Sequence, residues 1–598
     1  MAETLSFPPQ EEEKVVSEVL KTPKPEVSDQ PSKTDTLRRL LRYLTQYKGK
    51  LILVVLLLLI STVMNVLRPY LLGVGINQYI EKGIQEGLIN IVIAILGIGV
   101  VGWLAGLVQG WLMAEIAQSA MYALRRDLFN HIQTLSLHFY DKQPIGELMS
   151  RVINDTDAIN QLMSNGISQF LQSIFTLVGV LAAMLLLNIP LSIAVLVVVP
   201  LMGAAIALFA RYAGGAFADL QENMGEMNGY LEETVSGARV IKAYQQEESA
   251  EKSFDELSLA TRKADGKANF LALLMNPTTT FLTNLDIAIV AITGGWLTLQ
   301  DIVQVGTVAT FLNYARQFAR PLSQIAQLLN IILQAIAGAE RVFEILDTEP
   351  EIKDTPEAVV LSEVDGGVIF DHVDFSYVPG IQILHQSTFE AQPGQMIGLC
   401  GPTGAGKSTI INVLTRFYDI QDGMIGIDGQ NIYEVTTDSL RRTAGIVLQV
   451  PFLFSETVME NLRYGRLDAN DEECIEAAKL ANAHEFIERL PDGYQTVLSE
   501  GGNNLSQGQR QLLTIARVIL ADPDVLILDE ATSSVDTRTE QKIQAALLRL
   551  MEGRTSFVIA HRLSTIKDAD QIIVLDHGRI QEIGPHTELM KRKGFYYD

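Results

Sequence analysis

The sequence predicts two domains of different character: an α-helical membrane domain with six spans, followed by a soluble α/β domain. From Leu51 to about Leu333, apolar runs alternate with charged stretches, which is typical of helices that cross a bilayer repeatedly. From about Gly366 onward the composition is that of a soluble domain that mixes helices and strands. Within this second half, an apolar strand, a glycine-rich loop and an apolar helix follow one another at 396–410.

Charge and cysteine content exclude some classes of protein. The chain has 598 residues and a formal net charge of −24, so it lacks the basic surface that binding to a nucleic-acid backbone requires. We therefore expect no nucleic-acid partner. The two cysteines, Cys400 and Cys474, both lie in the soluble half, which argues against a disulfide framework and fits a reducing cytosol.

The first 35 residues are rich in Glu, Pro, Lys and Ser. Such a composition cannot bury enough apolar surface to offset the entropy lost on ordering. The segment also lacks the basic and apolar regions of a signal peptide. We expect residues 1–35 to form a disordered cytosolic tail.

Six apolar segments are the candidate membrane spans. The first, at 51–67, carries no charge and is followed by Arg68, which can extend to the membrane interface. The third and fourth meet at Asn188-Ile-Pro190, which leaves room only for a tight hairpin. The last two are less uniformly apolar, as expected of helices that line a polar cavity. The other five candidates are 88–113, 166–188, 190–210, 269–299 and 304–335.

The distribution of Lys and Arg predicts the orientation of these spans. Basic residues gather before span one, between spans two and three, and between spans four and five. The opposite loops contain little beyond Arg68 and Lys82. Because basic loops stay on the cytoplasmic side, we expect a multi-pass protein of the cell (inner) membrane with both termini in the cytoplasm.

Two long cytosolic excursions have helical composition and predict span helices that continue beyond the bilayer and turn at short breaks. The breaks are expected at 141–146 and near 235–237, and the alternative is that both excursions are ordinary loops. We expect residues 141–145 to form a turn between two long helices that docks the membrane half on the soluble domain. Asp286 lies inside an apolar span, where a carboxylate is costly and usually faces a cavity. It is a candidate for the substrate path, and the alternative is a capped residue near a kink or a wet rim.

The stretch at 396–410 has the order of a P-loop: a strand, then Gly401-x4-Gly406-Lys407-Ser408, then a helix. Glycines allow backbone N–H groups to surround phosphates. Lys407 is expected to reach the β- and γ-phosphates of ATP, and Ser408 to bind Mg²⁺.

Further polar residues follow the predicted strands downstream. Asp529 and Glu530 end the apolar stretch at 525–528, where Asp529 suits the Mg²⁺ shell and Glu530 can polarise the attacking water as the catalytic base. Gln449 is expected to orient water and touch Mg²⁺, and His561 to donate to the γ-phosphate. Each alone could be an ordinary surface residue, but their order after a P-loop favours a catalytic site.

From about Thr36 to Asp598 the chain resembles the ATP-binding-cassette (ABC) exporters, and the resemblance rests on the ATPase motifs GPTGAGKS, Gln449, LSQGQ, VLILDE, the SSVD at 533–536, and His561. It implies an ABC exporter fold, with a six-span transmembrane domain (36–338), a linker (339–360) and a P-loop α/β nucleotide-binding domain (361–598). It also implies that Tyr377 stacks on adenine and that two chains form a dimer. ATP would lie between the P-loop of one chain and the LSQGQ loop of the other. The expected ATP-binding residues are Tyr377, Gly401, Pro402, Thr403, Gly404, Ala405, Gly406, Lys407, Ser408, Thr409, Ser506, Gln507, Gly508 and Gln509.

This resemblance makes the chain a half-transporter that uses ATP and Mg²⁺ to export drugs, lipids or other amphipathic compounds. A homodimeric lipid flippase and a peptide exporter are the alternatives, although no peptidase-like Cys/His constellation precedes span one. A soluble cassette ATPase would lack the spans, and an importer would usually carry its membrane unit on a separate chain. A ligand-gated channel or regulator on the same scaffold stays open.

Gln507 is the one departure from the motifs, because a glycine is expected between Ser506 and Gly508. Gln adds a Cβ and a polar side chain where the backbone approaches phosphate. An altered loop beside an otherwise consensus-like site resembles one half of the bacterial heterodimeric drug exporters. We therefore expect a different partner chain, with a homodimer that tolerates Gln507 as the alternative.

Overall fold

The computed structural model describes residues 33–350, 352–529, 537–559 and 566–597 and divides into two compact units. Residues 33–133 and 145–348 form the membrane unit, and residues 134–144 and 349–597 form the second unit. Most of the predicted tail therefore lies outside the described residues. The first described helix, α2 (Lys33–Thr45), already includes its last positions.

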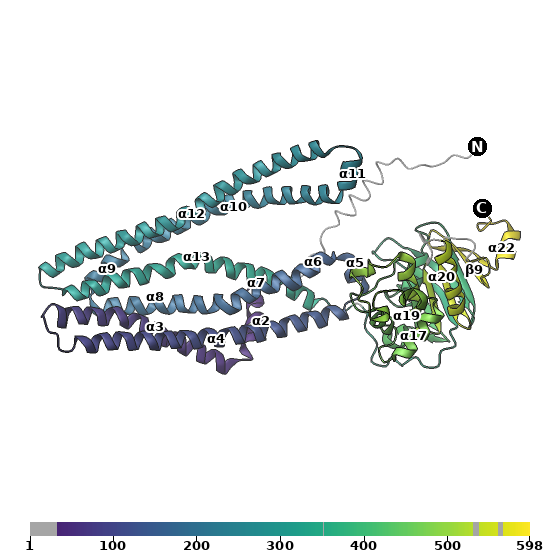
Figure 1. Ribbon diagram of the computed structural model, residues 1–598, viewed down its shortest axis with the longest axis horizontal. Helices are drawn as coiled ribbons and strands as arrows, with labels where there is room; N and C mark the ends of the chain where they lie inside the picture. The colour runs from purple at the N-terminus through teal and green to yellow at the C-terminus, as the bar shows by residue number, and fades with distance from the viewer. Residues whose placement is uncertain (1–32, 351, 530–536, 560–565, 598) are drawn as a thin grey trace. The chain divides into compact units, whose positions relative to one another are not determined.

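Long helices that run side by side build the membrane unit (Figure 1). They are α3 (Lys48–Gly75), α4 (Leu88–Thr134), α8 (Ile167–Leu187), α10 (Val199–Ser236), α12 (Glu247–Leu299) and α13 (Val305–Asp347). The shorter helices are α6 (Ile145–Ser150), α7 (Thr156–Gln161), α9 (Ile189–Leu196) and α11 (Ala238–Ala243). Two π-helical turns, Arg151–Asp155 and Leu162–Gly166, join α6, α7 and α8 into one helical stretch.

Helices end at the predicted hairpin, at residues 188–190, and at the predicted break near residues 235–237. The side chain of Asn188 accepts a hydrogen bond from the Leu191 backbone N–H, and Pro190 lies in the first turn of α9. Asn188 therefore caps the N-terminus of α9, at the hairpin between α8 and α9. Helix α10 ends at Ser236, and α11 connects it to α12, so that α10 and α12 form a long hairpin (Figure 1).

Among the residues that the structure describes, five stretches are long and apolar enough to cross a membrane: Lys48–Ile80, Leu88–Ile132, Ile145–Leu187, Ile189–Ser236 and Glu247–Leu299. The sixth predicted span corresponds to α13, which is less apolar because Asn313, Arg316, Gln317 and Arg320 interrupt it. Helix α13 nevertheless lies in the core of the bundle. Its Phe311 and Tyr314 are buried against residues of α8, α9 and α12, and the Tyr314 hydroxyl donates to the Val66 carbonyl of α3 at 2.9 Å. The helix continues to Asp347, beyond the boundary expected at residue 338.

The second unit contains two sheets. The antiparallel sheet has the order β2 (Leu384–Ala391), β1 (Val368–Phe375), β4 (Asp422–Ile427) and β5 (Gln430–Asn431). The other has the order β10 (Arg579–Gly584), β9 (Gln571–Asp576), β3 (Met396–Cys400), β8 (Thr555–Ile559), β7 (Val525–Asp529) and β6 (Ala444–Val447). All neighbours in this six-stranded sheet are parallel except β10 and β9. The described α-helices after residue 349 are α14 (Lys407–Leu414), α15 (Thr437–Thr443), α16 (Val458–Arg463), α17 (Asp471–Leu480), α18 (His484–Ile487), α19 (Gln507–Ala521), α20 (Thr537–Met551) and α22 (His586–Arg592).

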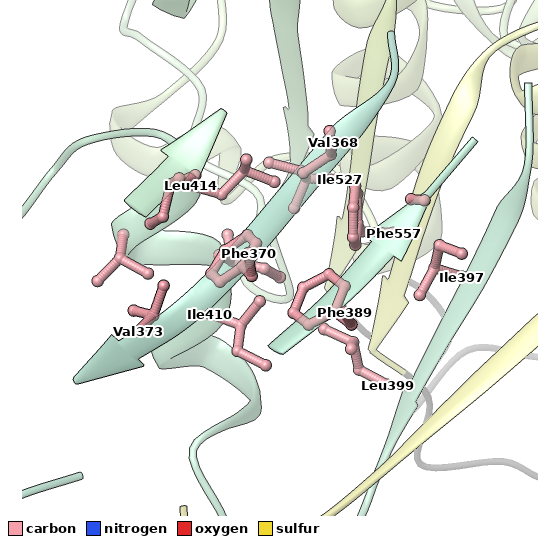
Figure 2. Close-up of a cluster of buried hydrophobic side chains, with 14 of the residues drawn as sticks. Val368, Phe370, Val373, Phe389, Ile397, Leu399, Ile410, Leu414, Ile527 and Phe557 are labelled. Carbon is pink, nitrogen blue, oxygen red and sulfur yellow. The ribbon is translucent and has the colours of Figure 1, made fainter. Parts of the chain in front are cut away.

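Both faces of the six-stranded sheet pack into hydrophobic cores, and two of these cores lie on opposite faces of β7. On β7, Ile527 belongs to one core and Leu528 to the other, as the two-residue period of a strand requires. Figure 2 shows the first core, where side chains of β1, β2, β3, β7, β8 and α14 converge. Phe370 and Phe389 stack there at 4.4 Å between ring centroids. The second core lies under α16, α17, α19 and α20.

One short segment of the membrane-domain sequence belongs to the second unit. Residues 134–144 include α5 (Leu137–Lys142), which ends just before Pro144. The Tyr418 hydroxyl donates a hydrogen bond to the Asp141 carboxylate, and the Tyr418 ring contacts the His138 ring edge to face at 5.8 Å. Helix α5 is thus held by the aromatic cluster of Phe375, Tyr377 and Tyr418. The residues that make these contacts lie at 138–141, so they overlap the predicted docking segment only at Asp141.

We predict that Tyr418→Phe releases α5. The substitution keeps the ring contacts but removes a hydrogen bond to a charged acceptor, which contributes about 1.5 to 3 kcal/mol. Backbone amides of 137–142 should then exchange with solvent about tenfold faster or more, as measured by hydrogen–deuterium exchange.

The matched control is Tyr433→Phe, because the Tyr433 hydroxyl accepts a hydrogen bond from the Ile420 backbone N–H within the same unit. It should leave exchange at 137–142 unchanged. Equal exchange at 137–142 in the wild type and in Tyr418→Phe would contradict the role of the Tyr418–Asp141 bond.

Candidate functional site

The register of the parallel strands aligns their carboxyl ends. Leu399 of β3 lies opposite Ile559 of β8, and Ile559 lies opposite Asp529 of β7. Leu528 in turn lies opposite Val447 of β6. Four neighbouring strands therefore end at nearly the same level, which is the edge where open α/β sheets bind ligands.

Several residues predicted for the nucleotide site lie at or just after these strand ends. The P-loop begins at Gly401 after β3, Gln449 follows β6 by two residues, and Asp529 is the last residue of β7. The structure therefore brings the P-loop, Gln449 and Asp529 to one edge of the sheet. Glu530 and His561 follow β7 and β8 in the chain but lie outside the described residues, so their roles stay predictions.

Two P-loop glycines are required by the backbone. Gly401 has φ = 147°, and a Cβ there would overlap the Leu575 carbonyl oxygen. Gly406 precedes the first residue of α14 and has φ = 100°, a conformation that residues with a side chain rarely adopt. The loop between them exposes Pro402, Thr403 and Gly404, while Ala405 is buried. This loop leads into the N-terminus of α14, where backbone N–H groups are available to an anion.

Lys407 is the first residue of α14, and only 7% of its surface is exposed. Its Nζ donates to the carbonyl oxygens of Gly401 and Pro402, at 2.8 and 2.9 Å, so the side chain lies along the loop. Burial lowers the pKa of Lys407, and the negative charge of Asp529 opposes this effect. Burial also raises the pKa of the neighbouring Cys400 thiol to about 11, so this thiol is protonated at neutral pH.

Tyr377 is half-buried and held in one orientation. Its hydroxyl donates to the Thr409 Oγ1 at 3.3 Å and accepts from the Asn412 side chain at 2.9 Å, so it is anchored to α14. Its ring meets Phe375 and Tyr418 edge to face. Tyr377 is therefore both part of the core and fixed beside the P-loop helix, and its stacking on adenine stays a prediction.

The donors expected to bind Mg²⁺ are of the kind that this ion prefers. Ser408 supplies an exposed hydroxyl in the first turn of α14, Gln449 is exposed after β6, and Asp529 is half-buried at the end of β7. Mg²⁺ takes few protein oxygens and completes its shell with water and phosphate. The three residues fit a magnesium site at this edge of the sheet.

The LSQGQ residues form the start of α19, which belongs to the second core and is separate from the P-loop helix. The Ser506 hydroxyl accepts from the Gln509 backbone N–H, and the Gln509 side chain accepts from the Ser506 N–H, which makes a capping box. Gln507 is the first helical residue and has no positive φ. Gly508 is buried behind it. Glutamine therefore causes no backbone strain at position 507, and any effect on a nucleotide must come from its side chain.

Two cavities in the described part of the membrane unit are lined in part by residues of α13. The larger has a volume of about 810 Å³ and is lined mainly by amide and hydroxyl side chains of α3, α4, α13 and the segment 164–176. These include Asn65, Gln109, Gln169, Gln172, Gln317 and Gln324. The smaller has a volume of about 370 Å³ and lies between α10, α12 and α13. Arg320 lines both cavities, and Arg316 lines the smaller one.

Asp286 does not line either cavity. It is 3% exposed and lies on α12 between the buried residues Leu282 and Val290, each four positions away. In the described part of the chain its Oδ1 has no hydrogen-bond partner. The structure thus places the carboxylate in the packed interior of the bundle, and its role in the substrate path stays a prediction.

Arg316, Arg320 and Tyr418 did not appear among the sequence candidates. The two arginines each lie three residues after an amide of a predicted span, Arg316 after Asn313 and Arg320 after Gln317, a helical spacing that indicates a polar face. Tyr418 carried no such signal because its partner, Asp141, is 277 residues away in the chain.

Two family models match successive parts of the chain. Residues 51–322 match the family model "ABC transporter transmembrane region", and residues 384–533 match the model "ABC transporter". The uncharacterized ABC transporter ATP-binding protein YfiC of Bacillus subtilis (strain 168) is 45% identical over 563 residues, which are 94% of this chain and 93% of that protein.

A second relative is the fatty acid ABC transporter ATP-binding/permease protein of Mycobacterium bovis (strain ATCC BAA-935 / AF2122/97). It is 42% identical over 527 residues, which are 88% of this chain and 83% of that protein. The solved structure of a bacterial Atm1-family ABC exporter with ATP bound matches with a TM-score of 0.76 and 30% identity, and covers 92% of this chain and 97% of that one.

The predicted ABC exporter fold is confirmed, and so is the coupling of an ATPase to transport. Identity across nearly the full length of both chains, together with a P-loop edge in one domain and long apolar helices in the other, leads to one conclusion: this chain belongs to the ABC transporter family, as a multi-pass half-transporter of the exporter type that works as a dimer.

Proposed function

We propose that this half-transporter moves amphipathic compounds, lipids or drugs, out of the cytoplasm or the inner leaflet. The observation that carries the proposal is the 810 Å³ polar cavity among apolar helices, in the same chain as the ATP site. A polar cavity inside an apolar bundle suits a molecule with a polar head and an apolar body. The name of the fatty acid transporter that shares 42% identity supports a lipid-like substrate.

At the nucleotide site we assign Lys407 to the phosphates, and Ser408, Gln449 and Asp529 to Mg²⁺. When bound, Mg²⁺ would neutralise charge on the β- and γ-phosphates. Glu530 acts as the catalytic base, and Gln449 and His561 orient the water and the γ-phosphate. Both termini lie in the cytoplasm, because the basic residues gather in the loops on that side.

Transport itself is tested with purified protein in lipid vesicles. ATP should drive the transfer of fluorescent lipids or dyes across the bilayer, and the same compounds should stimulate ATP hydrolysis. Movement of solute without ATP, or current through an open pore, would instead support a channel or regulator.

Lys407→Ala should weaken ATP binding by about tenfold or more, because a buried lysine makes charge-assisted contacts with phosphate. Isothermal titration calorimetry measures this affinity. Lys479→Ala is a suitable control, since Lys479 forms only an exposed ion pair with Glu476. If Lys407→Ala binds ATP like the wild type, Lys407 does not contact the phosphates.

Glu530→Gln should retain ATP binding but hydrolyse ATP at least about 100-fold more slowly, because a general base contributes a rate enhancement of this size or more. The variant should accumulate with ATP as a closed dimer, which cross-linking between the nucleotide-binding domains can detect. Glu552→Gln alters an exposed glutamate after α20 and should hydrolyse ATP normally. Near-normal turnover in Glu530→Gln would assign the base to another residue.

We also propose that the partner is a different chain. The P-loop side of this chain matches the ATPase motifs, whereas Gln507 places a polar side chain at the start of α19, where the partner's γ-phosphate is expected. The partner would supply an intact loop over this chain's P-loop. Because Gln507 has ordinary helical geometry, the side chain is the cause, and Gln507→Ala should relieve it as well as Gln507→Gly.

Expression of this chain alone tests the heterodimer. The wild type should be a poor ATPase without its partner, and both Gln507→Ala and Gln507→Gly should increase the steady-state ATPase rate of the isolated chain severalfold. A stable wild-type homodimer with brisk, substrate-stimulated hydrolysis and transport would support the homodimer instead.

A further inference from the structure

Two arginines lie within α13, the helix that corresponds to the sixth predicted span. Arg316 and Arg320 are roughly 16 to 23 Å along α13 from its first residue, Val305, at 1.5 Å per residue. The hydrocarbon core of a bilayer is about 30 Å thick, so both arginines lie within it if α13 starts near the membrane surface. Charges at this depth are expensive and normally serve a site or a pathway.

Both arginines are exposed and belong to cavity walls. Arg320 lies on the turn after Gln317 and one turn before Gln324, so these three residues form one polar face of α13 toward the larger cavity. Arg316 and Arg320 are one turn apart and both line the smaller cavity. The two cavities thus share a cationic wall.

The described lining of the two cavities contains no aspartate or glutamate. Its other polar groups are amides and hydroxyls, such as Gln109, whose side chain donates to the Ser168 hydroxyl at 3.1 Å. The membrane carboxylate singled out in the sequence, Asp286, is buried on α12 beside the lining residue Ile287 and is not among the lining residues. A cationic guest would meet two like charges here without a compensating carboxylate from the described lining, which disfavours it.

An anionic guest fits this chemistry. A guanidinium group presents N–H donors in a planar fork that matches the oxygens of a carboxylate or phosphate, and neighbouring amides add neutral donors. Helix α12 contributes Asn276 and Thr280 to the lining of the smaller cavity. Next to these two residues, the large apolar side chains of Leu273 and Phe281 are exposed on the same helix. An acyl chain can lie against such residues while the headgroup stays in the cavity.

We propose that Arg316 and Arg320 bind the oxyanion headgroup of an acidic amphiphile, a carboxylate or phosphate carried on a long acyl chain. The proposal names the substrate class of the transport site and rests on the function proposed above. It predicts selection by headgroup charge, whereas a drug exporter without such selection would respond mainly to apolar bulk.

The test compares headgroups on one chain. Oleate, oleyl phosphate, oleyl alcohol and oleylamine share their hydrocarbon chain and differ in charge. Binding of each to the purified dimer, in nanodiscs of phosphatidylcholine and without nucleotide, is measured by competition against radiolabelled oleate. Oleate or oleyl phosphate should compete at least about tenfold better than the alcohol, and the amine should compete worst. The order of the two anions distinguishes carboxylate from phosphate recognition.

Variants link this selectivity to the arginines. Arg320→Gln should raise the half-saturating concentration of the anion about tenfold or more, and Arg320→Lys should lie between it and the wild type, because lysine keeps the charge but loses the fork. The matched control is Arg68→Gln, which removes an exposed arginine of α3 that lines neither cavity and should leave anion binding unchanged.

Equal competition by all four amphiphiles, or unchanged anion binding in both Arg320→Gln and Arg316→Gln, overturns the proposal. Loss of dimer in Arg320→Gln with intact anion binding also overturns it, because the arginine would then serve subunit contact. These readouts do not involve ATP, so ATP-driven transport in vesicles remains a separate measurement. Transport with no headgroup selectivity would leave the exporter function standing and remove only this inference.

Discussion

The parallel register of β3, β8, β7 and β6 is the constraint on which the nucleotide site depends. Side-chain packing on both faces fixes this register, since Ile527 and Phe557 enter one core while Leu528 and Val558 enter the other. A shift by one residue would turn every side chain to the opposite face, so the carboxyl ends are held at one level. The P-loop, Asp529 and Gln449 therefore meet at this edge of the sheet.

This constraint also explains how much of the site the sequence alone could predict. The P-loop is a local motif between a strand and a helix, and the residues after parallel strands must share an edge, so Lys407, Asp529 and Gln449 could be grouped from order alone. The contact between Tyr418 and Asp141 could not, because it joins segments 277 residues apart through an ordinary tyrosine and an ordinary aspartate. The two cavities likewise need the packing of several helices, and only the charges of Arg316 and Arg320 could be read in advance.

Two residues show where a pattern and a structure answer different questions. In the sequence, Gln507 stands where a glycine is expected, which suggests that the backbone there loses the conformational freedom of glycine. The structure places it in the first turn of α19 with helical angles and a full capping box, so the backbone does not need glycine there. Asp286 drew attention because a carboxylate in a span usually faces a cavity. In the structure, Asp286 lies on a buried stripe of α12, between Leu282 and Val290.

Helix α13 joins the polar cavities to the charged end of the membrane unit. Its N-terminal half contains Arg316 and Arg320. Near its C-terminal end, Arg341 donates to the Asp155 carboxylate at 2.7 Å, and Glu344 accepts from the buried Arg151 at 3.0 Å. Asp155 and Arg151 are buried, whereas their partners Arg341 and Glu344 are exposed, so each pair joins a buried charge to one that faces solvent. A rigid shift of α13 would therefore carry the segment 151–155 with it or break these pairs, whereas bending at Pro321 would let the two ends of the helix move separately.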